Sequence, residues 1–175
     1  YYGGGYGGGR HQIPRGGFLK MHADFTRHQR LNLDRRLNVL IYLNQEWQED
    51  YGGHLELWDR TMSECVQKIL PIFNRCVIFA TTDISYHGHP EPLSCPEGMT
   101  RKSIAQYYYT SGRPDVVADA PTTTYRHRPE ELVRMQSLGY RSRATAAQLL
   151  EHAASWAHKP AGLLRRLADM VQPRH

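Results

Sequence analysis

Between Phe18 and Thr110, apolar residues fall in short runs that are separated by turn-forming residues. The runs are rich in Val, Ile, Leu and Tyr and are shorter than an ordinary helix, which favours strands. Several short strands with no long helix between them predict a mostly β sandwich or jelly roll. The predicted strands are Phe18–His22, Asn38–Leu43, His54–Trp58, Lys68–Ile72, Arg75–Thr81 and Ser103–Thr110.

The run Arg75–Thr81 is continuously apolar in its centre and is predicted to be a buried strand. Cys76 lies in this run and is predicted to be a small core residue. Neither Cys65 nor Cys95 forms a CxxC pair with it, so a zinc finger has no support. An odd number of cysteines with no disulfide pattern, together with no recognisable signal peptide, leads us to expect a cytoplasmic protein.

The pattern changes after Gly112, where a linker precedes a helical appendage. Pro129 followed by two acidic residues predicts a helix start, and Gly139 predicts its end. Apolar residues at helical spacing in Thr145–His158 and Leu163–Val171 predict further helices.

The first 17 residues hold eight of the fifteen glycines. This segment is interpreted either as a mobile flap that carries tyrosines over a pocket or as a flexible linker. The predicted organisation is a flap or linker over 1–17, a β core over 18–112, and a linker with C-terminal helices over 113–175.

Composition narrows the class of protein. With 175 residues, of which 40% are hydrophobic, the chain can bury a core and is not a disordered tail. It contains no run of about 18 apolar residues, so no membrane partner is expected. The net charge of +5 raises the question of a nucleic-acid partner. Much of the excess lies in the last 50 residues, and a solvated basic face is the favoured interpretation.

Candidate chemistry begins with His22 and Asp24. Residues two apart in a strand point to the same face, so this imidazole and this carboxylate can reach one metal ion. A third ligand from Ser85–His89, where His87 and His89 are both candidates, would complete a set of two histidines and one carboxylate. That set leaves coordination positions open and suits Fe(II) oxygen chemistry.

Arg101 follows His87 by fourteen residues, at the start of a predicted strand. A permanently charged guanidinium there suits a two-point grip on a dicarboxylic acid. The order of His-x-Asp, a remote histidine and an arginine is more informative than any one of these residues.

The stretches FLKMHADF, RRLNVLIYLNQEW, GGHLELWD, FNRCVIFATTDISYHGHPEPL and TRKSIAQYYYT resemble the prolyl-4-hydroxylase-like branch of the 2-oxoglutarate/Fe(II)-dependent oxygenases. The resemblance covers Gly17–Thr110 and implies a double-stranded β-helix, a jelly roll with iron at its open end. It also implies Fe(II), 2-oxoglutarate as co-substrate and molecular oxygen, with ascorbate as an optional reductant.

The resemblance assigns roles to individual residues. It implies that His22, Asp24 and His87 hold the iron. It implies that Arg101 and Tyr42 hold the C5 carboxylate of 2-oxoglutarate, that Leu55 contacts the co-substrate, and that Tyr107 lines the site. The twelve residues from Arg75 to His87 match the family register and favour His87 over His89. Further aromatic residues are candidates for an apolar shell, with core packing as the alternative for each: Phe25, Trp47, Trp58 and Tyr109.

The implied reaction is hydroxylation of an aliphatic C–H, in a prolyl or other amino-acid side chain of a protein or peptide, or in a free amino acid. Three alternatives stay open: a nucleic-acid demethylase with the same iron centre, a non-catalytic cupin-like metal-binding protein, and an interaction module that docks a partner through its helical tail. The oligomeric state is not predicted.

Overall fold

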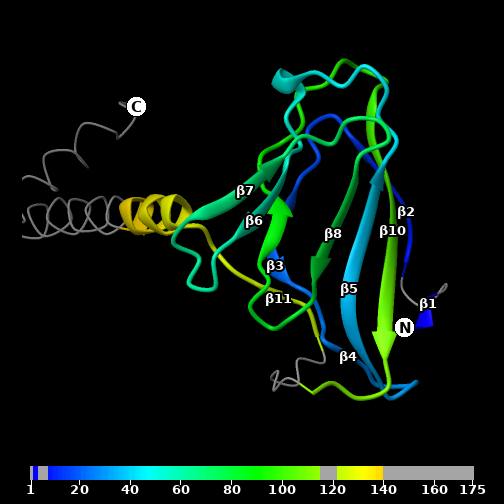
Figure 1. The fold of residues 1–175 in the computed structure, drawn as a ribbon. Coiled ribbons are helices and arrows are strands. Elements are labelled where there is room, and N and C mark those ends of the chain that lie inside the picture. The colour runs from blue at the N-terminus through cyan, green and yellow to red at the C-terminus, as the bar shows by residue number, and fades with distance from the viewer. Residues whose placement is uncertain (1, 4–7, 115–121, 140–175) are drawn as a thin grey trace, which may run out of the picture. The chain divides into compact units, whose positions relative to one another are not determined.

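The computed structural model describes residues 2–3, 8–114 and 122–139. The chain divides into two compact units, Tyr1–Pro129 and Glu130–His175. All of the described strands belong to the first unit, in which they form two sheets (Figure 1). Within the described residues no helix has both the length and the apolar character that a bilayer span requires.

The larger sheet is antiparallel and is built around two long strands. Strand β5 (Leu33–Tyr42) pairs with β10 (Thr100–Thr110), so that Leu40 lies opposite Ala105 and Tyr42 opposite Ser103. The flanking strands are β1 (Tyr2–Gly3) and β2 (Gly9–Pro14) beside β10, and β4 (Arg27–His28) and β8 (Cys76–Ala80) beside β5.

The smaller sheet has the order β11-β3-β9-β6-β7. Its strands are β11 (Thr124–Tyr125), β3 (Leu19–Ala23), β9 (His87–His89), β6 (Leu55–Trp58) and β7 (Cys65–Ile69). A 3₁₀ turn, η1 (Glu49–Tyr51), precedes β6. Residues 129–139 are helical. Residue 129 is the last residue of the first unit, and residues 130–139 are the described part of the second unit.

Apolar residues from both sheets meet in the core. Tyr42 of β5, Leu55 of β6 and Val77 of β8 form one buried cluster. Met21 and Ala23 belong to a second cluster, and they alternate along β3 with His22. Because neighbouring residues of a strand face opposite sides of its sheet, His22 points away from the second cluster. The prediction of a jelly-roll core is confirmed.

Most of the predicted strands appear within a few residues of their expected positions. The larger differences are at β5, which starts five residues before the predicted Asn38–Leu43, and at β7, which lies three residues before the predicted Lys68–Ile72. The helix starts at Pro129, as predicted. The predicted helices Thr145–His158 and Leu163–Val171, and the chain beyond Gly139, lie outside the described residues. The domain boundaries stay a prediction.

The glycine-rich start needs a correction. Gly9–Pro14 were expected in a flap or linker, and they form β2, which pairs with β10 from Arg101↔Ile13 to Ala105↔Gly9. Five of its six residues are exposed, and only Ile13 is half-buried. An edge strand of this kind has no hydrophobic periodicity, which explains why it was missed.

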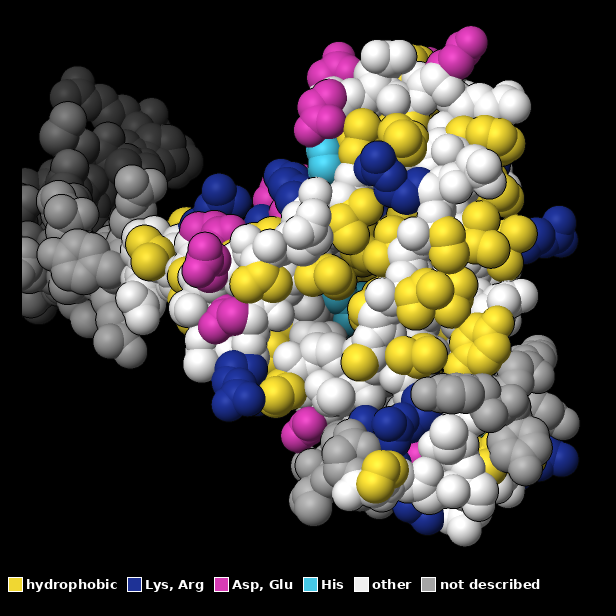
Figure 2. All heavy atoms as spheres, viewed as in Figure 1, with side chains coloured by type: hydrophobic (Ala, Val, Ile, Leu, Met, Phe, Trp, Pro, Cys, Tyr) yellow, Lys and Arg dark blue, Asp and Glu magenta, His cyan; other side chains and the backbone are white. Residues whose placement is uncertain are grey.

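The interpretation of Arg75–Thr81 as fully buried is wrong. In β8, Val77 is buried while Cys76, Ile78 and Ala80 are exposed. Apolar side chains gather over β8 and its neighbours on the face in Figure 2. Cys76 is therefore an exposed thiol, and the buried cysteine is Cys95.

We expect the three thiols to react with an external thiol reagent in the order Cys76, Cys65, Cys95. Cys65 is half-buried and burial raises its pKa, which lowers its thiolate fraction. Cys95 has no exposed surface and waits for unfolding. Timed labelling with peptide mass spectrometry measures the order, and a Cys76→Ser control should lack the fast phase. Equal rates for Cys95 and Cys76 would contradict this arrangement.

Candidate metal and co-substrate site

His22 and His87 lie directly opposite each other on the paired strands β3 and β9. Their ring centroids are 4.4 Å apart. Gly88 permits this approach, because a Cβ at its position would lie 2.8 Å from the Leu19 carbonyl oxygen and 3.0 Å from that of Lys20. The strand pairing therefore brings together two imidazoles that are distant in the sequence.

Each imidazole is oriented by a backbone carbonyl two residues before it. His22 Nδ1 lies 2.9 Å from the Lys20 oxygen, and His87 Nδ1 lies 3.0 Å from the Ser85 oxygen. Because a carbonyl only accepts, each Nδ1 donates this hydrogen bond, and the Nε2 of each ring faces Asp24, where a neutral ring would offer its lone pair to a metal ion. This is the arrangement that metal-binding histidines use.

Asp24 completes the cluster. Its Oδ1 lies 3.6 Å from His22 Nε2, and its Oδ2 lies 3.4 Å from His87 Nε2. Among the described residues, His22, Asp24 and His87 form a group whose potential metal-ligand atoms all lie within 4.8 Å of one another. His87 belongs to this group, and His89 does not.

Arg35 and Asn38 hold the Asp24 carboxylate from the other sheet. Oδ2 accepts from Arg35 at 2.9 Å and from Asn38 at 2.8 Å. Arg35 is buried, and its guanidinium lies 3.5 Å from the centre of the Tyr107 ring and 4.6 Å from that of Phe25. Burial opposes ionisation of Asp24, but the hydrogen bond and charge of His87, the charge of Arg35 and the Asn38 hydrogen bond outweigh it and hold its pKa well below the ordinary value.

Arg101 is a buried cation at the start of β10. It is 4% exposed, and it donates from Nε to the Gly53 oxygen at 2.8 Å and from Nη2 to Tyr42 Oη at 3.3 Å. In the described part of the chain no carboxylate lies within 4 Å of it. Burial lowers the pKa of Arg101, because a charge without a counter-charge is unfavourable in the interior. A buried cation of this kind suits an anionic ligand.

The close fit around Arg101 depends on Gly53. This residue has a φ of +71°, and a Cβ there would lie 2.5 Å from Leu93 Cδ2 and 3.0 Å from Arg101 Cδ. Glycine is the residue that combines this backbone conformation with the absence of a side chain. Its carbonyl is consequently available to Arg101.

The remaining predicted residues fall in different places. Leu55 packs in one buried cluster with Tyr42, beside Arg101. Tyr107 and Phe25 stack on Arg35 rather than covering an open site. Trp58 and Trp47 belong to clusters that do not contain the site, and Tyr109 contacts His28 in β4.

His89 shares the inward face of β9 with His87. It is 2% exposed, and burial, Arg101 and His22 lower its pKa to about 3. Neither ring nitrogen has a hydrogen-bond partner among the described residues.

Sequence reasoning missed Arg35 and Asn38. A charged and an amide residue in one strand would ordinarily face solvent, and their burial at 1% and 2% exposure is the signal that identifies them. Two imidazoles and one carboxylate are the donor set that suits Fe(II) with open coordination positions, so these residues fit such an ion.

The comparisons with known proteins agree with this chemistry. Residues 9–109 match the model of the 2OG-Fe(II) oxygenase superfamily, and the chain belongs to that superfamily. Membership implies Fe(II), 2-oxoglutarate and oxygen.

The chain is also similar to curated prolyl hydroxylases. It is 30% identical over 103 residues to prolyl 3-hydroxylase OGFOD1 of Mus musculus, covering 55% of this chain and 18% of the relative. The Xenopus laevis protein of the same name is 28% identical over 126 residues, with coverage of 67% and 24%. The chain thus spans no more than about a quarter of these relatives.

A solved structure is also similar, a prolyl hydroxylase from Trichoplax adhaerens in complex with a hypoxia inducible factor oxygen degradation domain peptide fragment. It is 27% identical, with a TM-score of 0.45, and the match covers 57% of this chain and 41% of that one.

Arg35→Met should weaken Fe(II) or Mn(II) binding by about 10- to 100-fold, because the Asp24 carboxylate loses a partner that orients it. Anaerobic metal titration measures the affinity, and circular dichroism checks the fold. Arg30→Met, at an exposed position, is the matched control and should bind as the wild type does. Unchanged affinity in Arg35→Met would show that Asp24 needs no such support.

Proposed function

We propose that this chain is the catalytic core of an Fe(II), 2-oxoglutarate-dependent dioxygenase that hydroxylates an aliphatic C–H of a prolyl or other amino-acid side chain in a protein or peptide. In this proposal His22, Asp24 and His87 hold the iron, and Arg101 with Tyr42 holds the distal carboxylate of 2-oxoglutarate. Leu55 forms part of the apolar wall, and Tyr107 acts through Arg35.

The observation that carries the proposal is Arg101, a buried cation that has no counter-charge within the described residues and lies in the same β unit as the His22–Asp24–His87 cluster. His89 lines one pocket with Gly53, whose carbonyl accepts the hydrogen bond from Arg101, and it is two residues from His87 in β9. A metal-binding cluster alone is compatible with a cupin-like protein. A cation with no acidic partner beside it favours a ligand that bridges from the metal to an anion site.

Bound Fe(II) and 2-oxoglutarate supply the oxygen chemistry that hydroxylates a C–H bond. The residues of the chain bind and orient. Tyr42, which is fully buried, and Leu55, at 3% exposure, keep water away from Arg101 and strengthen its electrostatic attraction for a carboxylate.

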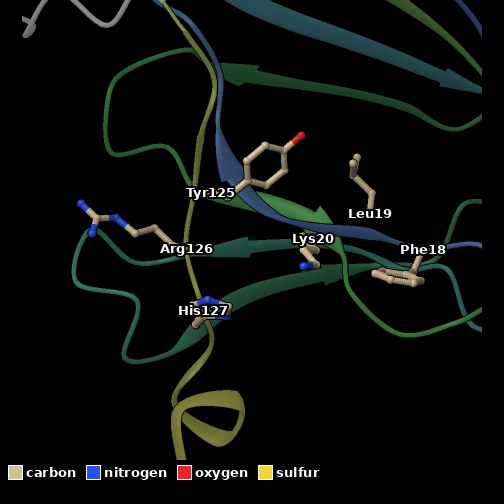
Figure 3. Close-up of a pocket in the computed structure, with 6 residues that line it drawn as sticks. All are labelled: Phe18, Leu19, Lys20, Tyr125, Arg126 and His127. Atoms are coloured by element: carbon tan, nitrogen blue, oxygen red, sulfur yellow. The ribbon is translucent and has the colours of Figure 1, made fainter. Parts of the chain in front are cut away.

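A pocket next to His22 provides a place for the substrate. Its volume is about 480 Å³, and its wall contains Phe18, Leu19 and Tyr125 together with the polar residues Lys20, Arg126 and His127. Tyr125 lies opposite His22 on β11, with ring centroids 5.7 Å apart. In Figure 3 the side chains of Tyr125 and Leu19 extend to the same side of β3. The apolar and aromatic part of this wall suits a small ring such as that of proline, and the names of the relatives support a prolyl substrate.

The test is turnover by the purified chain with Fe(II), 2-oxoglutarate and oxygen. We expect succinate release from the wild type, stimulated by prolyl peptides that gain 16 Da on mass spectrometry. His22→Ala should lose metal binding. Arg101→Met should keep metal binding and weaken 2-oxoglutarate binding by about 100-fold, since a charged partner is lost. A wild type that binds metal but neither binds nor decarboxylates 2-oxoglutarate would exclude the proposal.

Tyr125→Ala should raise the KM for the peptide by about tenfold, because an aromatic wall is removed beside the iron ligand. The affinity for 2-oxoglutarate should stay unchanged. Steady-state kinetics over a peptide series separates the two effects. Tyr108→Ala, at a half-buried position on β10, is the matched control. If the affinity for 2-oxoglutarate changes instead, Tyr125 contacts the co-substrate and not the peptide.

A further inference from the structure

His89 is a buried histidine that the protein does not satisfy. It is 2% exposed, and both Nδ1 and Nε2 lack a hydrogen-bond partner among the described residues. A neutral imidazole has one donor and one acceptor, and nearly all buried polar groups in native proteins have a partner. An unsatisfied pair of this kind is retained where a ligand supplies the partner.

The position of His89 points to the same ligand as Arg101. His89 and Gly53 line one pocket of about 270 Å³, and the Gly53 carbonyl accepts the hydrogen bond from Arg101 Nε. At its other side, His89 is two residues from His87 on the same face of β9. His89 is therefore near both the backbone group that holds Arg101 and the strand that supplies His87.

Each of the acidic residues that line this pocket has a basic partner other than Arg101. Glu49 lies 2.8 Å from His54 Nε2, Glu56 lies 3.8 Å from Lys68 Nζ, and Glu91 lies 2.6 Å from Arg128 Nη2. Arg101 is thus the charge in this region that has no counter-charge within the described residues.

We propose that His89 donates a ring N–H to an oxygen of 2-oxoglutarate, as a second polar anchor of the co-substrate beside Arg101. This inference rests on the proposed function. It makes His89 a positioning residue for the co-substrate and not a ligand of the iron. No group in the described protein competes for the ring nitrogen that would donate.

The test compares wild type, His89→Leu and His89→Gln, with His11→Leu on the exposed face of β2 as the matched control. Two affinities are measured without oxygen: that of Fe(II) alone, and that of 2-oxoglutarate for the Fe(II) protein, followed by charge-transfer absorption. The thermal midpoint is recorded with and without 2-oxoglutarate.

We expect His89→Leu to bind Fe(II) as the wild type does and 2-oxoglutarate about tenfold more weakly, because a hydrogen bond to a charged group is lost. His89→Gln, which keeps an N–H, should recover part of the affinity. The ligand-free midpoint of His89→Leu should be equal or higher, since an unsatisfied buried group has been removed. A histidine with only a structural role would instead lower the midpoint and leave 2-oxoglutarate affinity unchanged.

Two results would overturn the inference alone. One is 2-oxoglutarate affinity in both variants equal to that of the wild type. The other is loss of Fe(II) binding in folded His89→Leu and His89→Gln, which would make His89 a metal ligand. If the wild type itself binds Fe(II) but not 2-oxoglutarate, the proposed function fails and the inference fails with it.

Discussion

The ion pair between Asp24 and Arg35 is the interaction on which the candidate site depends. Asp24 follows β3 of the smaller sheet, and Arg35 lies on β5 of the larger one, with 2.9 Å between the charged atoms. Because Arg35 is 1% exposed, separation of the sheets here would leave an uncompensated buried charge, which is unfavourable by about 3–5 kcal/mol. The same carboxylate oxygen faces His87. The packing of the two sheets and the position of the acidic donor therefore depend on one group.

The imidazoles are positioned by a different device. His22 donates to the Lys20 carbonyl in its own strand, and His87 donates to the Ser85 carbonyl just before β9. The orientation of each ring is therefore set by backbone two residues away. Gly88 then lets β9 approach β3 closely enough for the rings to meet. The carboxylate is thus fixed by side chains across the sheets and the imidazoles by backbone within one sheet. Loss of the Arg35 and Asn38 contacts therefore leaves the backbone contacts of the two imidazoles in place.

Sequence periodicity predicts the strands whose side chains alternate between core and surface, such as β5 and β10. It misses β2 because that edge strand is exposed, and it misses β9 and β11 because strands of three and two residues are too short to show a period. The His-x-Asp pair is visible in the sequence because both residues lie in one stretch of chain. Arg35 and Asn38 are not, since their contact with Asp24 exists only after two sheets pack. Cys76 was placed in the core because a run of apolar letters does not show which face of its sheet is covered.

Arg101 and His89 are both incompletely satisfied in the interior. Within the described residues, Arg101 has hydrogen bonds without a counter-charge, and neither ring nitrogen of His89 has a hydrogen-bond partner. Both conditions lower the stability of the ligand-free chain, and a dianion bound beside them would return that free energy as affinity. Selectivity follows from the same imbalance. A ligand without a distal carboxylate leaves Arg101 as unpaired as before, so a site of this design discriminates by what it leaves unsatisfied. Arg101 and His89, whose burial is unfavourable, are thus the groups that would determine which ligand the site binds.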